Sequence, residues 1–197
     1  TTCAVDASHS LWCWGANRHG QLGDGTTVDR PTPGQVASLT DVRSVSVATD
    51  HVCAVTGDGA AWCWGDNWFG ALGDGSFEGS TVPVPVEGLS GVSSIVAGAG
   101  SIGGYTCALA DGGMVWCWGS NDLGELGNPA LDWRHPSPSQ IEGLTGVVHL
   151  AASIDNCVCG GGHVCVAHAE GTVSCWGQND RGQLGNGTLD PSPVPTP

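Results

Sequence analysis

Three cysteines and a histidine occur within nine residues in the segment CVCGGGHVC, which begins at Cys157 and ends at Cys165. Thiolate and imidazole groups are the usual ligands of zinc in proteins, so this spacing is typical of a compact metal site. The same residues also fit a disulfide-bonded segment, or two superposed patterns. The other cysteines of the chain decide between these hypotheses.

Eight of the ten cysteines form four pairs with one common spacing of ten residues. Each pair flanks a short turn, as expected for two cysteines that face each other across a β-hairpin. Opposed positions in antiparallel strands bring the β-carbons to about 4.5–5.5 Å, within reach of a disulfide. Buried free thiols are the alternative, and the recurrence of opposed pairs favours the bonds. We therefore predict four disulfides: Cys3–Cys13, Cys53–Cys63, Cys107–Cys117 and Cys165–Cys175.

One sequence unit occurs four times along the 197 residues. The segments WCWGANRHGQLGDGT, WCWGDNWFGALGDGS, WCWGSNDLGELGNPA and SCWGQNDRGQLGNGT align in register. Each Cys-Trp-Gly triplet is followed by Asn-x-x-Gly-x-Leu-Gly, and the triplets begin at residues 13, 63, 117 and 175. The chain is therefore predicted to be one repeat domain, with approximate repeats 1–33, 34–86, 87–140 and 141–197.

Alignment with the other repeats divides CVCGGGHVC into two parts with different predicted roles. The second half superposes on His51-Val52-Cys53 of an earlier repeat, so Cys165 already has a partner in the hairpin pattern. Cys157 and Cys159 remain, in a segment where the fourth repeat is longer than the others. We predict a local Cys157–Cys159 disulfide, with intermolecular pairing or a metal as the alternatives.

Short β-strands are predicted within each unit. VRSVSVA (42–48) alternates apolar and polar residues, and VCAV (52–55) and AWCW (61–64) flank a short glycine-containing hairpin loop. Proline-rich stretches such as TVPVPV fit an edge strand or a linker. No window shows a helical period. The pattern predicts an all-β fold of β-propeller-type blades, each a small antiparallel sheet stacked on its neighbour.

The unit is similar to the repeat of the regulator-of-chromosome-condensation family, whose core is Trp-Gly-x-Asn-x-x-Gly-Gln-Leu-Gly. The four matches cover essentially the whole chain, and the bacterial secreted type of this family is the expected branch. The resemblance implies propeller blades, and complete members usually close a ring of seven. Members range from a nuclear exchange factor for a small GTPase to bacterial secreted inhibitors of β-lactamases, so the fold alone does not choose a function.

Four repeats imply a ring that is incomplete in this chain, closed differently, or completed by other chain segments. The first repeat lacks its first strand, and the final Pro193–Pro197 aligns with a segment that precedes such a strand. Three hypotheses follow: a fragment of a longer propeller, a small ring with one strand missing, or copies that associate through their open ends.

The amino-acid composition limits the classes of partner that the protein is expected to bind. The chain has 19 acidic residues against 5 arginines, no lysine, and a formal net charge of −14. Such a surface repels phosphate backbones, which argues against nucleic-acid binding, while a cation or a basic partner is compatible with it. No apolar run is long enough to predict a membrane span. Paired cysteines favour an oxidising compartment, hence a secreted, extracellular or cell-surface protein.

Two tryptophans lie outside the repeat pattern. By the period of two, Trp62 and its strand neighbours are expected to pack between blades. Trp68 beside Phe69, and Trp133 beside Arg134, are instead predicted to form an exposed contact surface, because tryptophan and arginine are favoured at interface anchors.

The turns carry polar side chains of several kinds. Asp24 and Asp74 offer carboxylates for calcium, but each turn supplies too few, so the asparagines and aspartates are expected to stabilise their own turns. Asn186-Gly187-Thr188 matches the N-glycosylation sequon and predicts a glycan at Asn186 if the producing cell glycosylates such sites.

No recognisable catalytic constellation is present, and the protein is predicted not to be an enzyme. We predict a secreted β-propeller module that acts as a structural or binding surface in a cell-surface or extracellular assembly of a bacterium. Its partner is a protein, or further copies of itself, that completes the open blade. The alternatives are a carbohydrate-binding or metal-binding propeller, and a fragment of an inhibitor-like propeller.

Overall fold

The computed structural model describes residues 1–100, 102–154 and 161–197. These residues form four antiparallel sheets, which we name blades 1 to 4 in chain order. The all-β fold predicted from the repeats is therefore present. None of the described segments is a helix long and apolar enough to cross a membrane.

The strands follow one another regularly along the chain. Blade 1 contains β1 (Thr2–Val5), β2 (Leu11–Gly15) and β3 (Arg30–Gln35). Blade 2 contains β4 (Val42–Val47), β5 (His51–Thr56), β6 (Ala61–Gly65) and β7 (Ser80–Pro85). Blade 3 contains β8 (Ser94–Ala99), β9 (Gly104–Ala110), β10 (Met114–Ser120) and β11 (Arg134–Gln140), with the 3-10 turn η1 (Asp111–Gly113) between β9 and β10. Blade 4 contains β12 (Val147–Ala152), β13 (His163–His168), β14 (Val173–Gly177) and β15 (Ser192–Thr196).

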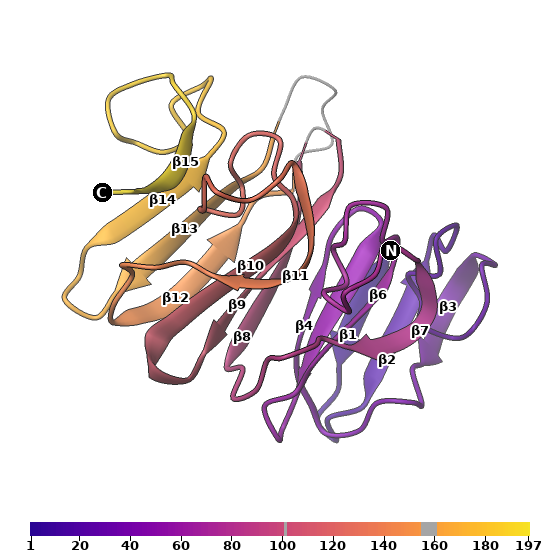
Figure 1. Cartoon of the computed structure of the whole chain (residues 1–197). Helices are drawn as coiled ribbons and strands as arrows, with labels where there is room; N and C mark the ends of the chain where they lie inside the picture. The colour runs from indigo at the N-terminus through magenta and orange to yellow at the C-terminus, as the bar shows by residue number, and fades with distance from the viewer. Residues whose placement is uncertain (101, 155–160) are drawn as a thin grey trace.

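Sequential pairing gives each blade a simple meander. In blades 2, 3 and 4 the strands are hydrogen-bonded in chain order, whereas blade 1 has three strands and lacks a counterpart of β4. The proline-rich strands β3, β7, β11 and β15 lie at the sheet edges, where a missing N–H is tolerated. The blades lie side by side in chain order, from indigo to yellow in Figure 1.

The hairpin between the two central strands sets the register of each blade. In blade 2, the amide of Thr56 donates to the carbonyl of Ala60, and Gly59 occupies a left-handed conformation with φ of 77°. This turn places Cys53 directly opposite Cys63. The Cα atoms of this pair are 4.1 Å apart and the sulfurs are bonded.

The core lies between consecutive blades rather than within one. Three tryptophans are fully buried there: Trp64, Trp118 and Trp176. The indole N–H of each donates to a backbone carbonyl in the loop of the preceding blade, at 2.8 to 2.9 Å. Because burial of an indole contributes a large apolar area and its N–H is satisfied, these contacts hold the blades together. The predicted packing between blades is confirmed for these three tryptophans, and Trp62 and Trp116 pack against the same cores.

Each of these loops also approaches the next blade closely through a glycine. Gly70 has φ of 84°, and a β-carbon there would lie 2.5 Å from the Cα of Pro136 in β11. Gly124 stands in the same relation to Pro193 in β15. The glycine of the Asn-x-x-Gly-x-Leu-Gly motif thus permits the backbone of one blade to touch the outer strand of the next.

Candidate functional site

The cysteines form the four bonds expected from their spacing: Cys3–Cys13, Cys53–Cys63, Cys107–Cys117 and Cys165–Cys175. Cys165 is therefore unavailable to a metal. Cys157 and Cys159 lie outside the described residues, as does their predicted bond. Within the part of the chain that is described, no three His, Cys, Asp or Glu side chains are grouped to hold a metal ion.

The tryptophans outside the repeat pattern come together at the surface. Trp68 and Phe69 lie in the loop after β6 of blade 2, and Trp133 and Arg134 lie at the start of β11 of blade 3. The rings of Phe69 and Trp133 meet edge to face, with centroids 5.8 Å apart. Residues more than sixty positions apart in the sequence thus form one surface.

Arg134 links the two sides of this surface. Its Nη1 donates to the carbonyl of Trp68 at 3.0 Å. Its guanidinium carbon lies 4.1 Å from the ring centroid of Phe77 and 4.8 Å from that of Trp133. These are cation–π distances, and they fix the arginine between two aromatic rings. We call Trp68, Phe69, Phe77, Trp133 and Arg134 the aromatic patch.

Arg134 has no counterpart arginine in blade 1. The strand register pairs Arg30 with Gly15, and in blade 3 it pairs His135, rather than Arg134, with the equivalent Gly119. Arg30 forms an ion pair with Asp24 at 2.8 Å, whereas the guanidinium of Arg134 lies over Phe77 of blade 2.

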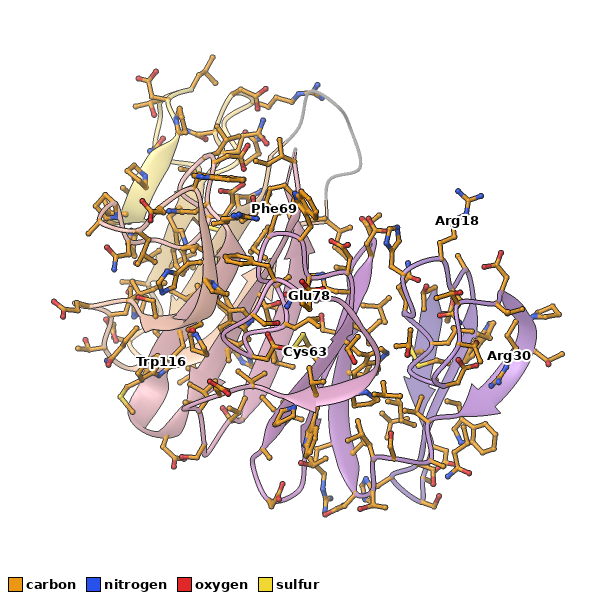
Figure 2. The ribbon with its side chains drawn as sticks, turned by 45° about the vertical axis from the view of Figure 1, so that its right-hand side comes forward. Arg18, Arg30, Cys63, Phe69, Glu78 and Trp116 are labelled. Atoms are coloured by element: carbon orange, nitrogen blue, oxygen red, sulfur yellow. A yellow bond between two sulfur atoms is a disulfide. The ribbon has the colours of Figure 1, made fainter. Side chains whose placement is uncertain are left out.

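The aromatic patch is open to solvent. Trp68 is 66% exposed and Trp133 is 52% exposed, while Phe77 is exposed as well. Figure 2 shows Phe69 and Glu78 on the same side of the molecule, with Arg18 and Arg30 far from them on blade 1. Phe77 was not among the residues predicted for this surface. It replaces a turn threonine of the first repeat, and that exchange for an aromatic residue was the available signal.

Two titratable groups are buried between blades. The Nε2 of His51 lies 2.9 Å from the hydroxyl of Thr106, and burial lowers the pKa of this histidine to about 4. Glu125 is 0% exposed, and burial raises its pKa to about 8, with a further contribution from the charge of Asp122. One carboxyl oxygen of Glu125 accepts from the amide of Leu123 at 2.9 Å, and the other has no partner in the described structure.

The asparagine and aspartate side chains of the turns form hydrogen bonds within their own loops, as predicted. The side-chain oxygen of Asn67 accepts from the amide of Leu72 at 2.9 Å, and its nitrogen donates to the carbonyls of Ser76 and Glu78 at 3.1 Å. Asp24 accepts from the amide and hydroxyl of Thr26, and Asn186 accepts from the same groups of Thr188. These aspartates and asparagines therefore serve turn geometry, and glycosylation of Asn186 stays a prediction.

The repeat pattern, the blade order and the loop glycines all correspond to one known family. The model of the regulator of chromosome condensation (RCC1) repeat matches residues 8–55, 58–108, 112–167 and 170–197. The chain belongs to the RCC1 repeat family. The RCC1 repeat begins inside one blade and ends inside the next, so the sequence unit and the structural blade are offset.

Curated relatives of this RCC1 chain include the human E3 ubiquitin-protein ligase HERC2, which is 34% identical over 196 residues that represent 96% of this chain and 4% of HERC2. The zebrafish (Danio rerio) protein RCC2 homolog is 36% identical over 89 residues, which are 45% of this chain and 17% of that protein. The chain thus spans a small part of these relatives.

Solved structures show the same arrangement of blades. Human WBSCR16 superposes with a TM-score of 0.81 at 23% identity, over 98% of this chain and 49% of that one. Prp20p of Saccharomyces cerevisiae superposes with a TM-score of 0.80 at 23% identity, over 98% of this chain and 47% of that one. The four blades therefore correspond to about half of a full RCC1 propeller.

Proposed function

We propose that this RCC1-repeat segment is a secreted, non-enzymatic binding module of a bacterium, with the aromatic patch as its contact surface. The observation that carries the proposal is the exposure of Trp68 and Trp133 beside an arginine that forms no ion pair within the described residues. Tryptophan and arginine dominate the energetic centres of protein interfaces. Grouped aromatic side chains in water mark an interaction surface.

The surroundings of the patch support a protein partner. Arg134 is already oriented by Phe77, Trp133 and the carbonyl of Trp68, so little side-chain entropy is lost when a partner covers it. The rest of the molecule is strongly acidic, which favours association with a basic protein. Four disulfides agree with an oxidising environment such as the cell exterior.

A capture experiment tests this function. The full chain, a Trp68→Ala/Trp133→Ala variant and a Leu189→Ala variant are immobilised and exposed to extracellular proteins of the producing organism. Leu189 is the matched control, since it is 64% exposed and lies on blade 4. We expect one protein that the wild type and the control retain and that the tryptophan variant loses by about 30-fold or more.

The comparison of the three proteins separates the hypotheses. Equal capture by all three excludes the aromatic patch as the contact surface. Loss of binding to a glycan array in the tryptophan variant, with no protein captured, favours the carbohydrate-binding alternative instead. The far-ultraviolet circular dichroism of the variants shows whether each is folded.

The two open faces of the chain favour a second function, in assembly with a further blade. Blade 1 presents Trp14 as the equivalent of the three buried interblade tryptophans. Blade 4 presents the carbonyl of Gln183 as the equivalent acceptor. Neither group forms this bond within the described residues, although the internal copies of the bond are all present. We propose that a partner protein or a second copy supplies the missing blade, head to tail.

Sedimentation velocity over a range of concentrations tests this assembly. If copies associate, the wild type shows a larger species at high concentration, and Trp14→Ala abolishes it. Val28→Ala is the control, because Val28 is 71% exposed outside the proposed contact. A monomer at every concentration for all three proteins contradicts association of copies.

A further inference from the structure

A cavity of about 580 Å³ opens between blade 3 and blade 4. Its walls come from the segment between β11 and β12, from the hairpin between β13 and β14, and from β15. The residues that matter for its chemistry are Glu142, Thr145, His168, Glu170 and Ser174. The aromatic patch contributes none of its walls.

The cavity lies where blade 4 lacks a tryptophan that the other blades carry. The residue before the second cysteine of each disulfide is Trp12 in blade 1, Trp62 in blade 2, Trp116 in blade 3 and Ser174 in blade 4. Trp62 packs against the core between blades 1 and 2, and Trp116 against the core between blades 2 and 3. Figure 2 shows Trp116 toward the opposite end of the strands from Phe69.

Blade 2 gives a direct comparison. The equivalent hollow there is lined by several of the same repeat positions, including Thr40 in place of Thr145 and Asp58 in place of Glu170, and it also contains Trp62. Its volume is about 280 Å³, and the cavity of blade 4 extends further, to residues 127–129 and to β15. The indole of Trp62 thus stands where blade 4 has the smaller Ser174, and the cavity has room for a ring of that size.

Two hydrogen bonds organise the cavity wall. The Nδ1 of His168 donates to the carbonyl of Thr145 at 2.8 Å, and its Nε2 lies within hydrogen-bond distance of the hydroxyl of Ser174, at 3.0 Å. The oxygen of Ser174 then remains free to accept a hydrogen bond from a ligand N–H. In blade 1 the same two positions are Asp6 and Trp12, and the indole N–H donates to the carboxylate at 2.9 Å. A hydrogen bond between these two positions thus occurs in blades 1 and 4, whereas blade 3 has Ala110 and Trp116 there and the Trp116 N–H has no partner in the described structure.

The charge at the cavity favours a cation. Glu142 and Glu170 line it and are exposed, and neither lysine nor arginine lines it. We propose that this cavity binds a compact aromatic amine, a ring of about indole size that carries an ammonium group. The ring occupies the place of the absent tryptophan, its N–H donates to Ser174, and its ammonium group faces the two glutamates.

Titration of the full chain with tryptamine, followed by NMR, tests the proposal. We expect saturable binding with a Kd on the order of 1 mM or lower, which is the range for a ligand of this size. The resonances that shift belong to His168, Thr172 and Val194, which line the cavity. Indole-3-acetate, which has the same ring and a negative charge, binds about tenfold more weakly.

Two reciprocal variants supply the controls. Ser174→Trp fills the cavity and weakens tryptamine binding by about tenfold or more, while Trp62→Ser opens the hollow of blade 2 beside Asp58 and creates a second site. The proposal is wrong if no saturable binding occurs, or if the shifts fall on Trp68 and Trp133. It is also wrong if a folded Ser174→Trp variant keeps the wild-type affinity. Equal binding of tryptamine and indole-3-acetate would exclude the role of the glutamates.

Discussion

Blade 2 and blade 4 have the same strand order and the same internal disulfide, and they differ in their neighbours. Among the described residues, blade 2 lies between blades 1 and 3, whereas blade 4 has only blade 3 beside it. Gly70 in the loop of blade 2 therefore touches Pro136, while a β-carbon at Gly182 of blade 4 would meet only the end of the Leu189 side chain at 3.8 Å. Cys63 is 0% exposed and Cys175 is 7% exposed.

The groups that build a blade are nevertheless identical in the two. The side-chain oxygen of Asn179 accepts from the amide of Leu184 at 2.9 Å, as that of Asn67 does from Leu72. Some residues thus stabilise a blade through contacts within it, and others contact the adjacent blade. A residue that contacts the adjacent blade can be replaced while the blade still folds, and Ser174, which stands where the other blades have tryptophan, is an example.

Of the substitutions that compare blade 2 with blade 4, removal of the disulfides should cause the largest loss of stability. Loss of a bridge that spans ten residues costs about 3 kcal/mol in free energy of unfolding. We expect Cys53→Ala/Cys63→Ala to cost about 4 kcal/mol, because a fully buried contact between blades is also lost, and Cys165→Ala/Cys175→Ala about 2 to 3 kcal/mol. Guanidinium unfolding measures both. A greater loss in blade 4 would contradict the assignment of its outer face as uncovered.

Substitution of the loop glycines should have the next largest effect. Gly70→Ala forces a β-carbon against the backbone of β11, and Gly182→Ala introduces only the strain of a left-handed alanine. We expect about 3 kcal/mol of destabilisation in the first variant and about 1 kcal/mol in the second. Equal values in urea unfolding would show that blade 2 gains nothing from contact with blade 3.

Much of the fold could be predicted from the sequence because the same spacings recur in every repeat and show which positions must face each other. The ten-residue separation of Cys53 and Cys63 fixed the hairpin and its register, and the edge position of the prolines followed from their missing N–H. Trp68 and Trp133 could be recognised as surface residues because they depart from the repeat. Their contact across two blades depends on tertiary packing, which a local pattern does not contain.

The cavity in blade 4 was missed for a different reason. Its sequence signal was present, since SCWG replaces WCWG in the fourth repeat. A serine in a strand, however, is compatible with many environments, and only the packed neighbours reveal that a ring is absent. Glu125 likewise stands at a position held by glutamine in two other repeats, and its burial decides its protonation state.

Above pH 6.5 the interface between blades 3 and 4 should respond to pH, because it buries Glu125 at the position that Ala71 occupies between blades 2 and 3. The folded state keeps the proton of Glu125 up to about pH 8, whereas the unfolded state releases it at the ordinary glutamate pKa. Stability therefore falls as pH rises and becomes constant above the folded pKa. Below pH 6.5 the buried neutral His51 acts in the opposite direction, because there the unfolded state gains a proton.

The clearest window for Glu125 is thus pH 6.5 to 8. We expect a decrease on the order of 2 kcal/mol across it, since one proton corresponds to about 1.4 kcal/mol per pH unit. Glu125→Gln should remove this decrease and raise stability at pH 8. Chemical unfolding at several pH values checks it, and an unchanged slope in the variant would assign the dependence to another group.

The smallest effect is expected for Ser174→Trp, which is best compared with the reverse exchange at Trp62 of blade 2. Trp62→Ser removes a half-buried ring from the core between blades 1 and 2 and should cost about 2 kcal/mol in free energy of unfolding. Ser174→Trp places a ring in a cavity of about 580 Å³ and should change stability by less than about 1 kcal/mol, because the gain in buried area offsets the lost bond to His168. Urea unfolding of the single and double variants measures both effects and their coupling, which should be near zero at sites two blades apart. If Ser174→Trp destabilises more than Trp62→Ser, the space in blade 4 is not shaped for a ring, and the packing of its walls requires the serine.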